Sequence, residues 1–195
     1  MRIYSHFVSG HLINQYLIVN DETREAVMID APDLDGNMIE IIEKNHFTLK
    51  ALLITHSHEA HIKSLGTIYK IYNPTLYAYF EEIGGMRTRK VEDKMIIREA
   101  GLEFECLHVP GHSLDSICYR TGSAIFTGDT LQSGFISQTR ALVEKELLIE
   151  GIKEKLMDYP DNTLIFPGHG PLSKIRIEKM FNQDILEANI LMNLD

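Results

Sequence analysis

Three of the chain's nine histidines fall within the six positions of HSHEAH (56–61). A neutral imidazole nitrogen is a good zinc ligand near neutral pH. His56 and His58 would share a face if the backbone is still extended there, because alternate residues of an extended chain point the same way. The cluster therefore predicts a metal site, against the alternative of a polar helix start with surface histidines.

Three further segments end an apolar run with a side chain that can bind metal. They are His112 in PGHS (110–113), Asp129 in TGDT (127–130) and His169 in FPGHG (166–170). Taken singly, each histidine could be an exposed turn residue and Asp129 a helix N-cap. Four apolar runs that all end in such a residue are hard to explain by coincidence, so we expect one shared site.

The elements expected to position these residues are strands in runs, interrupted by helices. Periodicity predicts strands at 2–8, 14–20, 25–31, 49–55, 75–80, 102–109, 115–120, 124–128 and 163–168. It predicts helices at 36–46, 59–72, 141–159 and from Ser173 onward, with 81–101 less regular. This order favours an α/β fold of two mixed sheets with helices outside. A length of 195 residues favours a single domain, 1–195.

Composition excludes some classes of partner. A formal net charge of −9 argues against binding to nucleic acid, because nothing neutralises the phosphates. No run approaches the roughly 18 apolar residues of a membrane span. The first residues lack the continuous apolar stretch of a signal peptide, so we expect a cytoplasmic protein. Cys106 and Cys118 are then expected to be buried thiols rather than a redox pair or metal ligands.

In this order, the four segments resemble the metallo-β-lactamase fold superfamily. Within it, the chain is most similar to the small glyoxalase II-like hydrolases, without the extra C-terminal helical domain of true glyoxalase II. The resemblance runs from NQYLIVN (14–20) to LIFPGHGPLSKIRIEKMFN (164–182). It implies a four-layer αββα sandwich of two mixed β-sheets with helices outside, and metals at one edge of the sheets.

The resemblance also implies a role for each site residue. One metal would bind His56, His58 and His112, and Asp129 would bridge to a second metal that also binds His61 and His169. Asp129 and His169 are the expected catalytic residues. The proton carrier could be His61, His169 or Glu59.

The chain departs from the family pattern at one ligand position. The motif HxHxDH has an Asp where this chain has Ala60. Loss of that carboxylate should weaken the second site and remove an acceptor that orients the attacking water. We therefore expect one firmly bound Zn²⁺ and a second that is weak or absent. Lys63-Ser64 replaces the usual Gly-Gly, and LQSGFISQTR (131–140) departs from the loop of relatives, where Gly-Arg and Asp are common.

Three functions are compatible with these residues. The first is hydrolysis of a small-molecule ester, thioester or lactone by a metal-activated water. The second is a mononuclear iron oxygenase of the persulfide dioxygenase type, with Fe²⁺ on His56, His112 and Asp129. The third is a non-enzymatic metal-binding or sensor domain, which Ala60 and the altered loop would suit.

Smaller features have two interpretations each. Asp30 and Asp115 could hold site histidines through hydrogen bonds, or could be ordinary turn and loop carboxylates. An apolar stripe on the last predicted helix could pack on the core or form a homodimer contact. Its members are Ile177, Phe181, Ile185 and Ile190.

Overall fold

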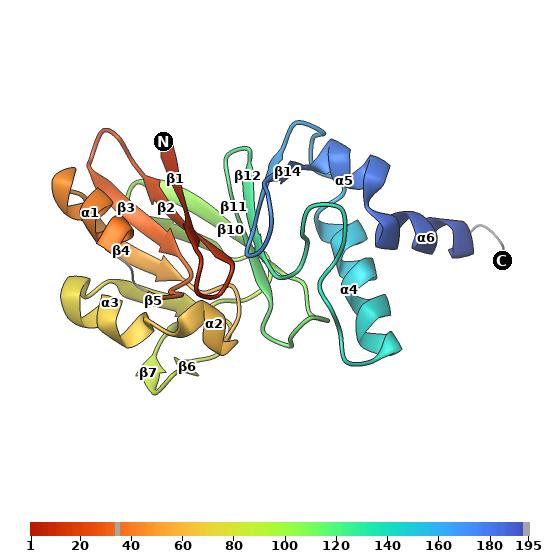
Figure 1. The fold of residues 1–195 in the computed structure, drawn as a ribbon, viewed down its shortest axis with the longest axis horizontal. Helices are drawn as coiled ribbons and strands as arrows, with labels where there is room; N and C mark the ends of the chain where they lie inside the picture. The colour runs from red at the N-terminus through yellow and green to blue at the C-terminus, as the bar shows by residue number, and fades with distance from the viewer. Residues whose placement is uncertain (34–35, 193–195) are drawn as a thin grey trace.

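The computed structural model describes residues 1–33 and 36–192, and it is a sandwich of two six-stranded sheets (Figure 1). The first sheet contains, in spatial order, β1 (Arg2–Val8), β2 (Ile13–Val19), β3 (Glu25–Ile29), β4 (Thr48–Leu53), β5 (Thr75–Ala78) and β8 (Arg89–Lys90). β1, β2 and β3 pair antiparallel, and the pairs from β3 to β8 are parallel.

The second sheet is also mixed. Its order is β14 (Ser173–Lys174), β13 (Leu164–Pro167), β12 (Ala124–Gly128), β11 (Ile117–Thr121), β10 (Leu102–His108) and β9 (Ile96–Glu99). β12 and β13 run parallel, and the other pairs are antiparallel. A separate hairpin joins β6 (Glu82–Ile83) to β7 (Met86–Arg87).

Three apolar layers hold the sandwich together. Between the sheets, Tyr16 packs against Phe126 and Phe166, with 5.3 Å between ring centroids in each pair. α1 (Gly36–Lys44) and α3 (Leu65–Tyr72) cover the first sheet through residues such as Ile42 and Ile68. α4 (Leu142–Lys155) and α5 (Ile175–Phe181) cover the second sheet. α6 (Gln183–Met192) extends away beyond α5, with Ile185 packed into the same apolar layer. The predicted four-layer αββα fold is confirmed.

The predicted helix at 59–72 is wrong in one respect, because it is two helices. α2 (Glu59–Ile62) ends one turn before α3 begins. The carbonyl of His61 accepts the amide of Ala31 at 2.7 Å, and the Ser64 amide donates to the Ala31 carbonyl at 2.9 Å. These bonds to the segment after β3 replace helical ones, so tertiary pairing overrides the local pattern.

The C-terminal prediction is also corrected. Residues from Ser173 form the short strand β14 and then two helices, because the backbone of Asn182 is extended and its side chain accepts the Ile185 amide at 3.3 Å. Ile185 is buried, whereas Ile177 and Phe181 are 41% and 63% exposed. These three residues do not form one stripe, and the side chain of Ile190 lies outside the described residues.

Two smaller expectations concern buried and membrane-spanning segments. Cys106 belongs to the apolar layer between the sheets, and Cys118 belongs to the layer under α4. Both are free, buried thiols, as predicted. In the described ranges, no helix combines the length and apolar character that a membrane crossing requires.

The irregular stretch 81–101 contains four short strands, β6 to β9, which the sequence pattern did not indicate.

Candidate metal centre

The six predicted site residues come together where strands of both sheets end. His56 and His58 follow β4, and His61 lies on α2. His112 lies in the loop after β10, while Asp129 and His169 follow the parallel neighbours β12 and β13. The last two meet because the carboxyl ends of parallel strands lie at the same edge of a sheet.

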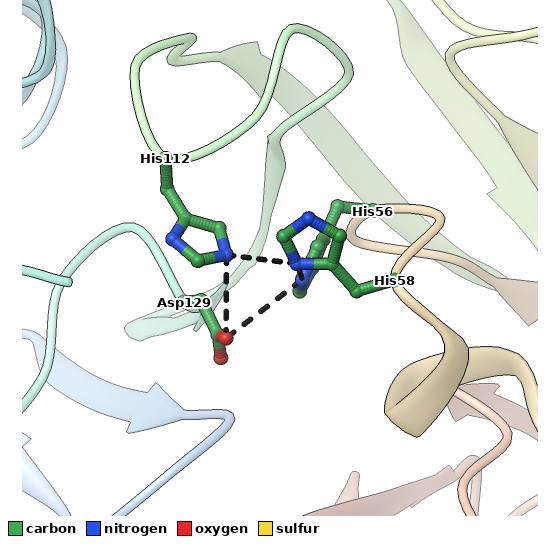
Figure 2. A group of neighbouring side chains, drawn as sticks. All are labelled: His56, His58, His112 and Asp129. Carbon is green, nitrogen blue, oxygen red and sulfur yellow. Dashed lines mark hydrogen bonds and ion pairs between the residues drawn. The ribbon is translucent and has the colours of Figure 1, made fainter. Parts of the chain in front are cut away.

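The first donor group consists of His56, His58, His112 and Asp129 (Figure 2). Nδ1 of His58 lies 3.0 Å from Nε2 of His56 and 3.0 Å from Nε2 of His112. Oδ2 of Asp129 lies 3.8 Å and 3.5 Å from the same two Nε2 atoms. One nitrogen from each ring and one carboxylate oxygen therefore converge on a common point.

The second donor group consists of His61, Asp129 and His169. Oδ1 of Asp129 lies 3.3 Å from Nε2 of His61 and 3.5 Å from Nε2 of His169. Each oxygen of Asp129 thus faces a different group, and the carboxylate links the two. Ala60 supplies no donor atom, so this group has three members among the described residues.

Two buried atoms of the second donor group lack hydrogen-bond partners. Nε2 of His61 and Oδ1 of Asp129 are buried, and although 3.3 Å apart they form no aligned hydrogen bond. Unpaired buried polar atoms cost roughly 1–3 kcal/mol each, and a bound cation would satisfy both. Gly168 leaves the space open, since a Cβ there would lie 2.7 Å from that oxygen. These residues therefore fit a divalent metal ion.

Asp30 supports histidines in both groups. This carboxylate, 2% exposed, accepts the Thr55 amide at 2.7 Å, the Thr55 hydroxyl at 2.8 Å and Nδ1–H of His61 at 2.8 Å. The Thr55 hydroxyl in turn lies 3.1 Å from Nδ1 of His56. A partner at Nδ1 fixes the tautomer that leaves Nε2 free for metal. Of the two interpretations of Asp30, the structure supports the hydrogen bond to a site histidine.

Backbone carbonyls support two further histidines. Nδ1–H of His112 donates to the Gln138 carbonyl at 3.0 Å, and Nδ1–H of His169 donates to the Leu12 carbonyl at 2.7 Å. Leu12 adopts a left-handed backbone (φ 53°), which is costly for a leucine and aims its carbonyl at the site. Sequence reasoning missed both acceptors, because every residue carries a carbonyl.

Asp115 bonds to the backbone of the histidine cluster. It accepts the backbone amide of Ser57 at 2.8 Å and is 4% exposed. It therefore fixes the backbone between His56 and His58 instead of contacting a histidine ring. Neither interpretation of Asp115 describes this contact fully, because the carboxylate is bonded to the backbone of the site and not to a histidine ring.

The protonation states suit metal binding in the first donor group. Burial and the neighbouring histidines lower the pKa of His56 well below its usual value, and burial lowers the pKa of His58. Both rings are therefore neutral, as metal ligation requires. Burial raises the pKa of Asp129, but the adjacent histidines outweigh it, so the pKa is lowered and the carboxylate is ionised.

His61 differs from these rings in the metal-free protein. Burial lowers its pKa, but Asp30 and Asp129 outweigh burial and raise the pKa to about 10. A site that stabilises a proton between two carboxylates also stabilises a metal cation there. Metal binding at His61 must therefore release a proton.

Comparison with protein families gives one match across most of the chain. The family model described as "Metallo-beta-lactamase superfamily" matches residues 8–169. A probable hydroxyacylglutathione hydrolase of Schizosaccharomyces pombe is 31% identical over 79% of this chain and 62% of that protein. The probable metallo-hydrolase YqgX of Bacillus subtilis is 29% identical over 85% of this chain and 89% of its own length. The chain spans about 60% of the length of three hydroxyacylglutathione hydrolases that it matches.

Solved structures share the fold. ETHE1 from Myxococcus xanthus superposes with a TM-score of 0.86 at 28% identity, covering 100% of this chain and 92% of that one. The B3 metallo-beta-lactamase BLEG-1 gives a TM-score of 0.83 at 22% identity, covering 94% and 99%. At 22% identity, the second likeness concerns the fold alone.

Proposed function

Because the chain belongs to the metallo-beta-lactamase superfamily, we propose that it is a metal-dependent hydrolase of a small ester, thioester or lactone. The observation that supports this most directly is the pair of donor groups sharing Asp129, with buried atoms that lack any other partner. The similarity to hydroxyacylglutathione hydrolases favours a thioester among the three.

The two donor groups would hold two metal ions of unequal affinity. His56, His58, His112 and Oδ2 of Asp129 would hold the firmly bound metal, for which we propose Zn²⁺. When bound, it would lower the pKa of a water toward about 7 and polarise the substrate carbonyl. His61, His169 and the other oxygen of Asp129 would hold a second metal weakly.

Exposure separates the three predicted proton carriers. The side chain of His61 is 1% exposed and bonded to Asp30, so it cannot reach a substrate. Glu59 is exposed at the start of α2 and belongs to neither donor group. His169 is 30% exposed, with Nδ1 fixed by Leu12 and Nε2 facing Asp129. We therefore assign proton transfer to His169, whose Nε2 is free whenever the second metal is absent.

Hydrolysis is tested directly by turnover. Protein loaded with Zn²⁺ is screened against esters, thioesters and lactones, with His112→Ala as the blank. We expect turnover of at least one class that His112→Ala lacks. Stoichiometric metal binding with no turnover of any of them would instead support a non-enzymatic metal-binding domain.

The weak second site is tested by restoring the carboxylate. Ala60→Asp should raise bound metal from about one equivalent to about two. Hydrolysis should rise with it, because a second cation stabilises the oxyanion, and this gain should outweigh the loss of His169 as proton carrier. Ala60→Asn is the matched control, since it has the same shape without the charge. Two equivalents bound with similar affinity by the wild-type protein would contradict the claim that Ala60 weakens this site.

An iron oxygenase is the second candidate. His56, His112 and Asp129 could form a two-histidine, one-carboxylate iron site, and the likeness to ETHE1 fits this alternative. His58 counts against it, because its Nδ1 is 3.0 Å from both other rings and adds a third nitrogen. Metal analysis of protein purified without added metal, together with oxygen uptake, separates the candidates.

A further inference from the structure

Two carboxylates on the C-terminal helices hold the loop that follows Asp129, which we call the 131–138 loop. Glu178 of α5 accepts the Gly134 amide through both oxygens, at 3.1 Å and 3.3 Å. Asp184 of α6 accepts the Ile136 amide at 3.1 Å. The Gln183 amide donates back to the Gly134 carbonyl at 3.3 Å. Two alternate amides of the loop are thus tied to these helices.

Glu178 is an unusual residue for packing alone. It is 0% exposed, and its other partners among the described residues are the Ser173 hydroxyl and the Asn182 side-chain amide, the latter at 2.8 Å. All of these donors are neutral, so no ion pair among these contacts offsets the desolvation of the carboxylate. An apolar side chain would fill the same space at lower cost, so the function of Glu178 is better explained by the loop that it holds.

The 131–138 loop leads directly to the first donor group. Leu131 and Ile136 form a bridge, and the Gln132 side chain donates to the Ser137 hydroxyl at 2.7 Å. These bonds make the turn stiff up to Ser137. The next residue is Gln138, whose carbonyl accepts Nδ1–H of His112 at 3.0 Å. Gln138 itself is exposed, so its place depends on the turn before it.

We propose that Glu178 and Asp184 are positioning residues for His112. They fix the 131–138 loop, and the loop fixes the carbonyl that keeps the proton on Nδ1 and Nε2 aimed at the other donors. The inference rests on the proposed metal centre. Loss of partners that orient a metal-binding histidine typically weakens metal affinity about 10–100-fold, and we expect an effect in this range.

Asp184 and Lys145 provide a matched test. Oδ1 of Asp184 lies 2.6 Å from Nζ of Lys145, while Oδ2 holds the Ile136 amide. Asp184→Ala breaks both contacts, whereas Lys145→Ala breaks the ion pair and leaves the loop bonded. Metal-free protein is titrated with Co²⁺ and followed by visible absorption. Asp184→Ala should weaken the first Co²⁺ about tenfold, and Lys145→Ala should leave it within about twofold of wild type. Equal affinities in the two variants would overturn the proposal.

Glu178 is tested with a control from its own helix. Glu178→Met removes the acceptor of Gly134, and Glu178→Gln keeps one oxygen for it. Ile175→Ala, at a buried position of α5 outside the 131–138 loop, gives a destabilised protein for comparison. We expect weak Co²⁺ binding in the Met variant only, with rescue by Gln. If Co²⁺ binding weakened in all variants in proportion to the fall in melting temperature, Glu178 would have a structural role alone. Wild-type protein that binds no Co²⁺ would instead overturn the proposed metal centre.

Discussion

Replacing Asp30 with asparagine should weaken both donor groups at once. Oδ1 of Asp30 accepts the Thr55 amide, and Oδ2 accepts both the Thr55 hydroxyl and Nδ1–H of His61. Asparagine has one oxygen, so its amide nitrogen must face at least one of these donors. If it faces His61, the ring loses the bond that keeps the proton on Nδ1. The other tautomer carries the proton on Nε2, which then cannot bind metal.

The size of the effect follows from these contacts. Loss of the partner behind a ligand histidine should weaken metal binding about 10–100-fold, or about 1.4–2.8 kcal/mol. A buried donor left unpaired costs a further 1–3 kcal/mol of folding stability, roughly. For a chain of this length, that lowers the melting temperature by about 2–4 °C per kcal/mol. Asp30→Asn should therefore still fold, but it should bind metal poorly.

The assay needs both sites occupied, so it is made in the Ala60→Asp background by calorimetric zinc titration. Thr55→Val is the matched control: it keeps the amide bond to Asp30 but removes the hydroxyl that lies 3.1 Å from Nδ1 of His56. We expect Asp30→Asn to weaken both sites and Thr55→Val only the first. Two zinc ions bound by Asp30→Asn as tightly as by its parent would refute the reasoning.

Three further predictions concern the metal centre. His56→Ala or His112→Ala should abolish tight metal binding, while His169→Ala should leave roughly one equivalent of metal in metal analysis. Equal losses of bound metal in all three variants would mean that the two donor groups bind metal as a single site. Asp115→Ala frees the Ser57 amide between two ligands and should weaken the first metal about tenfold in Co²⁺ titrations, with no change in the second. Chelation should lower the melting temperature reversibly while far-ultraviolet circular dichroism persists, because it removes up to about 4 kcal/mol of stabilisation when free metal is at a thousandfold excess over Kd. Complete unfolding on chelation would show that the core depends on metal.

The sequence indicated which residues meet at the candidate metal centre, because their signal is local. His56, Asp129 and His169 each follow a run of apolar residues that forms a buried strand, here β4, β12 and β13. Such runs are recognisable without tertiary information, and a polar residue that ends one must lie at a sheet edge. The assignment of ligands to two groups came from the family resemblance, and the structure gathers the same residues into those groups.

The errors lie where tertiary contacts decide the outcome. α2 stops at Ile62 because a backbone bond from Ala31 takes the carbonyl of His61, and nothing in the local pattern shows this. β8 is two residues long and pairs with β5, so its length gives no usable periodicity. Asp115 reaches a backbone amide 58 residues away, which spacing along the chain cannot reveal.

The geometry behind the histidines explains why the loss at Ala60 need not damage the first donor group. Four rings have an Nδ1 partner, and these come from separate places: Thr55 for His56, Asp30 for His61, Gln138 for His112 and Leu12 for His169.

His58 is the exception, because its Nδ1 faces the other donors and its ring is exposed. In the neutral ring, the proton then lies on Nε2. None of these five arrangements uses the side chain at position 60. The orientation of the first three histidines is therefore independent of that carboxylate. We propose that only the second group, which shares Asp129 and adds two rings that must be neutral to bind metal, holds a divalent cation weakly.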